Sequence, residues 1–281
     1  MEIIENLKNE IEKDVELNGA QVLSISAVNG ILKKPFDKEG VATNTFNKHF
    51  NNPNSEYYQM TVQQIIDKWE AKAAASREYG SMLDDYIGYN LNNDKDGLEM
   101  FNLDYDRDSD ERLNNICSSF DSFVNDYLNK HPELIFVTRE QMLYYKIPGT
   151  DQYIRGRFDA LFYNTKTNRF LIVDWKTSNE ITHKPSPWTG KLLGPAKELL
   201  DMDWYTYTIQ VYFYKTALEN GYLPEGIGVD CVIVQLPGHI INESGINYMV
   251  HNPAFEYNKE LLDKIFMFAH KKNILMNKQN G

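Results

Sequence analysis

Cysteine is scarce and long apolar runs are absent from this sequence of 281 residues. The two cysteines, Cys117 and Cys231, lie far apart and in no CxxC pair, so we expect free thiols rather than a disulfide framework or a thiolate zinc site. No apolar stretch approaches the about 20 residues of a membrane span, and the acidic start MEIIENLKNEIEKD is unlike a signal or transit peptide. We therefore expect a soluble, cytoplasmic protein without a membrane partner.

Basic residues are outnumbered, with 29 Lys and Arg against 40 Asp and Glu and a net charge of −11. Proteins that bind nucleic acid usually carry a basic surface. Residues 84–126, however, carry a local net charge of −9, which leaves −2 for the rest of the chain. Because the Debye length is about 8 Å at physiological salt, this acidic stretch need not control the field at a distant cleft. The charge argues against extensive nonspecific binding of duplex, but it does not exclude a nucleic-acid substrate.

Apolar periodicity and breaker residues predict helices first and an α/β region afterwards. Thr61 and Gln64 form a capping-box pattern before the longest helical stretch, in which Gly80 predicts a kink or a close packing contact. The acidic stretch at about 91–112 predicts a loop or insertion. The other predicted elements are helices over 1–17, 62–91, 114–131, 204–221 and 259–276, strands over 133–147, 227–236 and 246–251, and a hairpin over 155–178.

This order of elements predicts an α/β sandwich with a mixed central sheet flanked by helices. We expect one domain over residues 1–281. Its first part, 1–130, is mainly helical and contains the acidic insertion, and 131–281 forms the α/β core.

The predicted hairpin, RGRFDALFYNTKTNRFLIVDWKTS, carries one aspartate in each strand. The midpoint of Asp159 and Asp174 falls inside the turn NTKTN, so the two carboxylates should lie nearly opposite one another. Like charges at about 5 Å repel, and a cation should therefore lie between them. Period-two alternation places Lys176 on the face of Asp174, and Mg²⁺, which prefers oxygen ligands, is the other candidate. A buried Asp–Lys pair with a purely structural role is the alternative.

Asp159 followed by Asp174-Trp175-Lys176 resembles the D…(D/E)xK core of the PD-(D/E)XK nuclease superfamily. Gln210 and Tyr214 match the QxxxY motif of its RecB-like exonuclease branch, and their spacing places both on one helix face. The resemblance covers about residues 20–250 without the acidic segment, and it implies a restriction-endonuclease-like core with an additional helical N-terminal region. PFDKEGVA and LLGPAKELLDMD are similar to phage-encoded members, which implies a bacterial cell or a phage-infected host as the setting.

Two upstream positions extend the resemblance. Glu140 lies where many members carry a glutamate on the first core strand. GSMLDD resembles the Gly-x-x-hydrophobic-His segment, but Asp84 stands at the position of the histidine. Aspartate also coordinates hard cations, so Asp84 and Glu140 become candidate further ligands. Glu140 as a structural partner of Arg157 is the alternative.

The resemblance implies that Asp159 and Asp174 hold one or two Mg²⁺ or Mn²⁺ ions together with the Trp175 carbonyl. Metal ions of this kind activate water and neutralise phosphoryl oxygens. Lys176 then orients or deprotonates the water. The resemblance also implies that Gln210 and Tyr214 line the cleft and position the substrate or Lys176; hydrogen-bonded core residues are the alternative. Arg157, on the face of Asp159, is expected to meet a substrate phosphate. Some relatives carry a four-cysteine iron–sulfur cluster, which Cys117 and Cys231 alone cannot supply.

We therefore expect a Mg²⁺-dependent deoxyribonuclease, an exonuclease acting on linear DNA in recombination, repair or phage genome processing. Its expected partners are DNA and a helicase or recombination protein. A catalytically silent subunit that binds DNA ends or a helicase is a second hypothesis. A restriction-type endonuclease is a third, disfavoured by the QxxxY helix.

Overall fold

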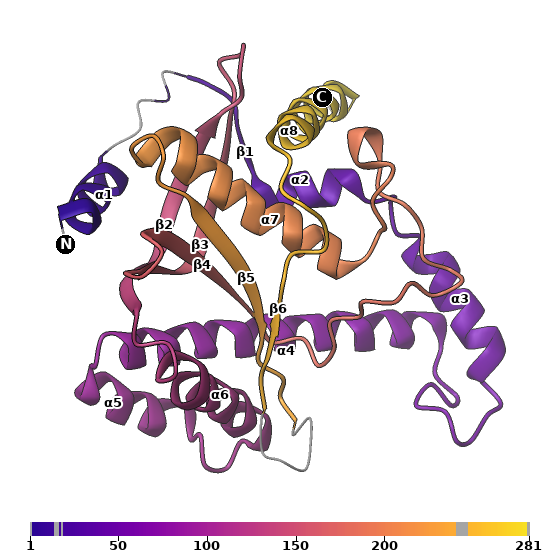
Figure 1. Ribbon diagram of the computed structural model, residues 1–281. Helices are drawn as coiled ribbons and strands as arrows, with labels where there is room; N and C mark the ends of the chain where they lie inside the picture. The colour runs from indigo at the N-terminus through magenta and orange to yellow at the C-terminus, as the bar shows by residue number, and fades with distance from the viewer. Residues whose placement is uncertain (1, 14–16, 18, 240–246, 280–281) are drawn as a thin grey trace.

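A mixed six-stranded sheet lies between two layers of helices in the computed structural model, which describes residues 2–13, 17, 19–239 and 247–279 (Figure 1). The strand order is β1-β3-β4-β5-β6, and β2 pairs with β3. The expected α/β architecture with a mixed sheet and flanking helices is therefore confirmed. The strands are β1 (Val22–Ser24), β2 (Leu134–Lys146), β3 (Tyr153–Asn164), β4 (Arg169–Lys176), β5 (Val229–Gln235) and β6 (Met249–His251).

β3 is the strand around which the sheet is built. It pairs antiparallel with β2 along nearly its whole length and antiparallel with β4 over its last residues, while its beginning pairs parallel with β1. β5 then adds parallel to β4, and β6 adds antiparallel to β5. The catalytic residues expected on the hairpin therefore lie in the centre of the sheet rather than at an edge.

The helices form two groups. α1 (Glu2–Glu12), α2 (Ile25–Leu32), α7 (Asp203–Ala217) and α8 (Lys259–Gln279) pack on one core cluster, whereas α4 (Val62–Leu91), α5 (Lys95–Tyr105) and α6 (Glu111–Phe123) pack on the other. α3 (Lys38–His49) packs on α4. The short helical turns are η1 (Val124–Leu128), η2 (Gly194–Ala196) and η3 (Leu218–Tyr222). No helix in the described part of the chain is both long and apolar enough to cross a membrane.

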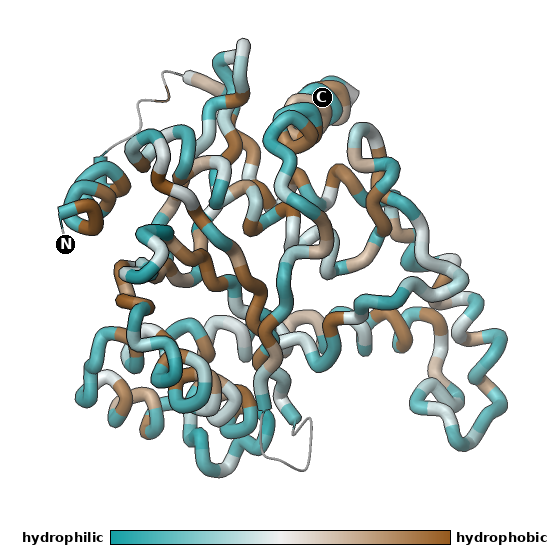
Figure 2. Tube along the Cα trace, viewed as in Figure 1, coloured by the Kyte–Doolittle hydropathy of each residue, from teal (hydrophilic) through white to brown (hydrophobic). Residues whose placement is uncertain are grey.

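Period-two alternation within β4 distributes its side chains between the two clusters. Phe170 and Ile172 belong to the cluster under α7, and Leu171, Val173 and Trp175 belong to the cluster under α6. A strand covered on both faces reads as a continuous apolar run, and Figure 2 shows hydrophobic residues concentrated along the central strands. Against this background Asp174 is the one charged side chain that β4 buries completely.

The prediction of a loop at about 91–112 is wrong, because most of this stretch is helical. α5 spans Lys95–Tyr105, and α6 begins at Glu111. The carboxylates of Asp94 and Asp110 cap these two helices by accepting from the backbone N–H groups of Gly97 and Leu113. Phe101 anchors α5 in the core. The acids at these positions satisfy helix N-termini, and sequence reasoning mistook them for a solvated acidic loop.

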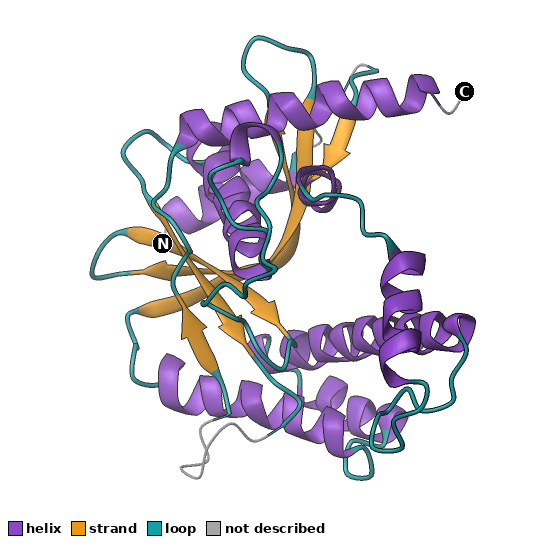
Figure 3. Cartoon of the chain, turned by 90° about the vertical axis from the view of Figure 1, so that its right-hand side faces the viewer, coloured by secondary structure: helices purple, strands orange, loops and turns teal. Residues whose placement is uncertain are grey.

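The capping box at the start of α4 is confirmed, since Thr61 and Gln64 exchange side-chain to backbone hydrogen bonds. The helix continues through Gly80, where an added Cβ would meet no atom within 4 Å, so the expected close packing contact is absent. Between Ile65 and Leu83 no residue of α4 is buried. The beginning of this stretch contacts α3, which lies away from the sheet (Figure 3), whereas Tyr79 and Met82 pack against the cluster under α6.

Candidate active site

The β3–β4 hairpin opens just where its two aspartates lie. Its ladder runs from Asn164–Arg169 to Ala160–Val173, and Asp159 and Asp174 form the next pair in the same register. The backbone N–H of Trp175 donates to Asp159 Oδ2 at 2.7 Å. Asp174 is fully buried and Asp159 is partly buried. The expectation that the two carboxylates oppose one another is therefore met.

Lys176 supplies the positive charge expected on the same face. Its Nζ lies 2.5 Å from Asp174 Oδ2 and 4.7 Å from the centroid of the Tyr207 ring. Burial lowers the pKa of the Lys176 ammonium, but the Asp174 and Asp159 carboxylates outweigh this effect and hold the pKa above its ordinary value. Lys176 is therefore a cation at neutral pH, suited to stabilising negative charge rather than to removing a proton from water.

The two carboxylates are not fully compensated by one ammonium. Burial and then the charge of Asp174 raise the pKa of Asp159 well above its ordinary value. Burial also raises the pKa of Asp174, although Lys176 opposes this shift. In the described part of the chain Asp174 Oδ2 has no hydrogen-bond partner in suitable geometry, even though Lys176 Nζ lies close to it. Excess negative charge on oxygen atoms of this kind is what a hard divalent cation relieves.

α7 fixes the orientation of Asp174. Gln210 Nε2 lies 3.2 Å from Asp174 Oδ1 and 2.9 Å from the Tyr214 hydroxyl oxygen, and the Tyr214 hydroxyl donates to the Arg157 carbonyl at 2.7 Å. Tyr214 is 1% exposed. The structure thus brings the QxxxY pair to the hairpin as hydrogen-bonded residues beneath Asp174, whereas the sequence reading placed them along the cleft.

Gly156 permits this close approach of α7. A Cβ at this position would lie 2.7 Å from the Phe213 ring, 2.8 Å from Ile25 and 3.0 Å from the Tyr214 ring. All three contacts are side chains packed in the core, which cannot move aside freely. A glycine on β3 therefore allows Gln210 to reach Asp174.

Glu140 lies on β2 opposite Asp159, because its neighbours Arg139 and Gln141 pair with Ala160 and Phe158. Its φ of 52° lies in the left-handed region, which is rare for a residue with a side chain. Glu140 Oε2 is 2.6 Å from Arg157 Nε. Burial and the charge of Asp84 raise the pKa of Glu140. In this structure Glu140 is thus the structural partner of Arg157, which was the alternative reading of the sequence.

Asp84 on α4 lies near the same end of the hairpin, and its negative charge raises the pKa of both Asp159 and Glu140. Burial raises the pKa of Asp84 itself, and Arg139 opposes this. Arg139 Nη2 donates to the Asp84 backbone carbonyl at 2.6 Å and so ties α4 to β2. Four carboxylates from three strands and one helix therefore influence one another here.

No three His, Cys, Asp or Glu side chains within residues 2–13, 17, 19–239 and 247–279 are already arranged around a single ion. The donor set that fits a hard cation is the opposed pair Asp159 and Asp174, with a backbone carbonyl and further oxygens from water or substrate. Cys117 and Cys231 are both buried, in different core clusters, and both are free thiols, as the sequence predicts.

Three residues of this site escaped the sequence reasoning. Tyr207, under the Lys176 ammonium, precedes Gln210 by three positions and Tyr214 by seven, so helical spacing could have shown that it shares their face. Arg139 and Gly156 act through contacts between elements distant in sequence, and no local pattern marks them.

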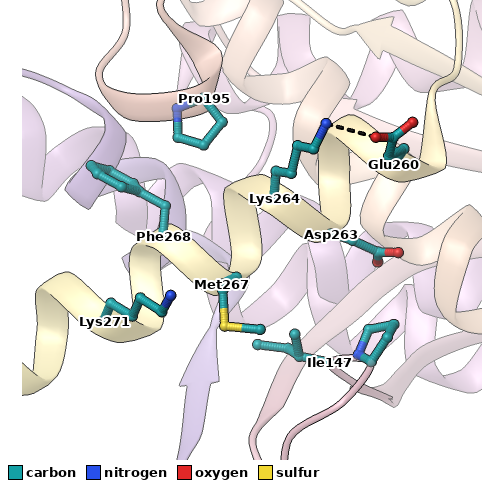
Figure 4. A pocket seen from close by; sticks show the side chains of 9 residues that line it. Ile147, Pro195, Glu260, Asp263, Lys264, Met267, Phe268 and Lys271 are labelled. Atoms are coloured by element: carbon teal, nitrogen blue, oxygen red, sulfur yellow. Dashed lines mark hydrogen bonds and ion pairs between the residues drawn. The ribbon is translucent and has the colours of Figure 1, made fainter.

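A cavity of about 430 Å³ with a mainly apolar surface lies beside α8 and the β2–β3 connection (Figure 4). Met267, Phe268 and Ile147 line it, and Lys264 at its edge pairs with Glu260 at 2.7 Å. It shares no residue with the hairpin site, so the hairpin remains the candidate active site.

Comparison with models of known protein families finds no match, and comparison with curated proteins finds none either. Among solved structures, one described as the crystal structure of SSO0001 is similar over 96% of this chain and 83% of its own length, with 10% identity and a TM-score of 0.38. A likeness at this level carries no argument about function.

Proposed function

We propose that this protein is a metal-dependent nuclease of the PD-(D/E)XK type, in the RecB-like branch, with a restriction-endonuclease-like core. Its reaction is the hydrolysis of phosphodiester bonds in linear DNA, starting from an end. The observation that carries the proposal is the opposed pair Asp159 and Asp174 with Lys176 Nζ 2.5 Å from Asp174. A fully buried and a partly buried carboxylate opposed across a hairpin are unfavourable for stability alone, which favours a functional reason for them.

Asp159, Asp174 and the Trp175 carbonyl would hold Mg²⁺ or Mn²⁺, which when bound supplies Lewis-acid activation of water and neutralises phosphoryl oxygens. Lys176 stabilises the negative charge that develops on the phosphate and keeps the attacking water oriented. Gln210 and Tyr214 act as positioning residues. Gln210 donates to Asp174, and Tyr214 accepts from Gln210 and donates to the Arg157 carbonyl.

Arg157 and Glu140 are suited to an exchange of partners when substrate binds. The Arg157 side chain is 59% exposed, so it can leave Glu140 for a substrate phosphate. The Glu140 carboxylate, opposite Asp159, would then be one of the residues that hold the cation. Asp84 on α4 faces the same group and is the fourth candidate carboxylate.

The second candidate is a catalytically silent subunit that binds DNA ends or a helicase partner. Intact carboxylates and lysine weigh against it, because uncompensated acids facing a polyanion weaken binding unless a cation is present. A restriction-type endonuclease remains a third candidate.

The test is release of nucleotides from end-labelled linear DNA and from closed circular DNA, with Mg²⁺ or Mn²⁺. We expect the wild type to degrade linear DNA and spare circles, and Lys176→Ala and Asp174→Ala to degrade neither. Cleavage of circles would favour the endonuclease. Binding of DNA without cleavage with either metal would favour the silent subunit.

A further inference from the structure

A polar cleft of about 620 Å³ begins directly beside the candidate active site. One wall is Thr177–Asn179, the residues that follow Lys176 at the end of β4. The other walls are Lys72 and Ser76 of α4 and the first residues of α6, Glu111 and Arg112. The cleft therefore continues from the end of β4 toward Lys72 and Ser76 in the middle of α4.

Arg112 is held in the cleft from three sides. Its guanidinium carbon lies 4.3 Å from the centroid of the Tyr79 ring, and its Nη2 lies 3.4 Å from Ser76 Oγ. Its aliphatic stem lies against Gly238, where an added Cβ would be 2.9 Å from Arg112 Cγ. An arginine fixed by stacking and packing loses little side-chain entropy when it binds an anion.

Arg112 and Lys72 form no close ion pair within the described residues, although their charges lower the pKa of Asp110 and Glu56 from a greater distance. Within the described residues neither Lys72 nor Arg112 has a carboxylate oxygen within 4 Å, although Glu111 lies on the same wall. The nearby Asp110 carboxylate is occupied by the Tyr79 hydroxyl at 2.8 Å and by the Leu113 N–H. The cleft therefore offers an Arg fork, an ammonium, and hydroxyl and amide donors to a ligand.

The spacing along α4 relates this cleft to the bond that is cut. Asp84 is tied to β2 beside Glu140 by the hydrogen bond from Arg139, and at 1.5 Å per residue Ser76 lies about 12 Å and Lys72 about 18 Å farther along the helix axis. In a duplex each strand has one phosphate per about 3.4 Å of helix axis, so this distance corresponds to about four to five phosphates of one strand.

We propose that this cleft binds the phosphate backbone of one nucleic-acid strand, about four to five phosphates from the cut bond, with Arg112 and Lys72 as the contacts. Naming the ligand as a nucleic-acid strand rests on the proposed function. The donors in the cleft are the types that contact phosphate oxygens. With one fork, one ammonium and one opposing carboxylate, the contact is local, which agrees with the low overall basic charge of the chain.

The test measures binding of a fluorescent double-stranded oligonucleotide to the full chain in EDTA, by anisotropy over a range of salt concentrations. Arg112→Gln and Lys72→Gln should each weaken binding by about five- to tenfold and reduce the slope of log K against log salt by about 1. Lys166→Gln is the matched control, because this exposed lysine pairs with Glu133 at the hairpin turn, outside the cleft. Lys72 is exposed, so its substitution leaves folding intact even if the Arg112 variant is less stable.

Cleavage kinetics give an independent readout. A contact remote from the reacting atoms is made equally before and during reaction, so Arg112→Gln should raise KM and leave kcat nearly unchanged. Unchanged affinity, salt slope and KM in both variants would overturn the inference while leaving the nuclease proposal intact. If the wild type binds the oligonucleotide but never cleaves it, and the variants still lose affinity, the nuclease proposal fails but the cleft remains a nucleic-acid binding site. A wild type that binds no nucleic acid would overturn both.

Discussion

The closed and open ends of the β3–β4 hairpin have opposite chemistry, although the same two strands form both. At the closed end the ladder from Asn164–Arg169 to Ala160–Val173 is filled with apolar side chains shared between two core clusters. At the open end the strands carry two opposed carboxylates and a lysine, and the Trp175 N–H donates to a carboxylate oxygen. The closed end contributes stability through burial, and the open end gives up stability to hold charges in place.

Substitution at the closed end should have the largest effect on folding and little effect on the reaction. Phe162 is 1% exposed and packs in the cluster under α6. Phe162→Ala should lower the free energy of unfolding by about 3–5 kcal/mol, because it removes apolar contacts and leaves a cavity. Urea unfolding measures this loss. At temperatures where the variant is folded its kcat should equal that of the wild type; a large loss of kcat there would contradict the separation of the two ends.

Substitution of Lys176 should have the reverse effect. Removing its charge should lower kcat by about 10²–10³-fold, the usual effect of losing one charge-stabilising group. Lys176→Arg keeps the charge with a different geometry and should recover part of the rate. The matched control is Ile172→Val, a substitution of a buried core residue in the same strand, β4. It should lower the free energy of unfolding by about 0.5–1.5 kcal/mol and leave kcat unchanged. Wild-type turnover in Lys176→Ala would remove this lysine from the mechanism.

A buried histidine makes the open end sensitive to acid. Gln235 pairs with Lys176 across β4 and β5, and its Nε2 donates to the Ser178 carbonyl, so its Oε1 accepts from His251 Nε2 at 3.0 Å. His251 Nδ1 lies 2.8 Å from His183 Nε2. Burial and then the neighbouring His183 lower the pKa of His251 to about 4.

His251 therefore binds a proton near pH 6.5 in the unfolded chain but only near pH 4 in the folded chain. Stability is fully present above about pH 6.5 and falls as the pH drops toward 4, by up to about 3 kcal/mol. Urea unfolding of wild type and His251→Gln between pH 4 and 8 checks this. The difference between the two proteins should shift in favour of the variant as the pH falls, and parallel curves would refute the role given to His251.

The smallest effect is expected where α7 approaches the open end. Gly156→Ala places a methyl group against the rings of Phe213 and Tyr214, and such overpacking costs about 1–3 kcal/mol. Gly30→Ala in α2 is the control, because an added Cβ there meets no atom within 4 Å, and it should be neutral or slightly stabilising. Thermal unfolding compares the two. Equal melting temperatures would mean that the close approach at Gly156 is unimportant.

Much of the hairpin could be predicted from the sequence because its rules are local. The turn NTKTN fixed the register, the register placed Asp159 opposite Asp174, and alternation placed Lys176 beside Asp174. The capping box at Thr61 is likewise a pattern within four residues. Such features depend on the strand and helix geometry of adjacent residues, which the sequence carries directly.

The wrong and missing predictions involve contacts between distant segments. Asp94 and Asp110 were predicted to lie in a loop, because an aspartate caps a helix only if the helix begins next to it. The helical signal of α5 is weak as well, since Phe101 is the residue that this helix buries in the core. The close approach at Gly156 depends on Phe213 and Tyr214, more than fifty residues away in sequence. The pairing of Glu140 with Arg157 was one of two readings of the sequence, because the register between β2 and β3, which no motif sets, decides between them.

The most direct measurement is calorimetric titration of the metal-free protein with Mg²⁺ and Mn²⁺, without DNA. We expect the wild type to bind one or two ions, and Asp159→Asn and Asp174→Asn each to lose this binding while remaining folded. Asp151→Asn, at the exposed β2–β3 turn, is the control and should bind as the wild type does. Metal binding that survives in both hairpin variants, or is absent from the wild type, would contradict the claim that the open end of the hairpin is a metal centre.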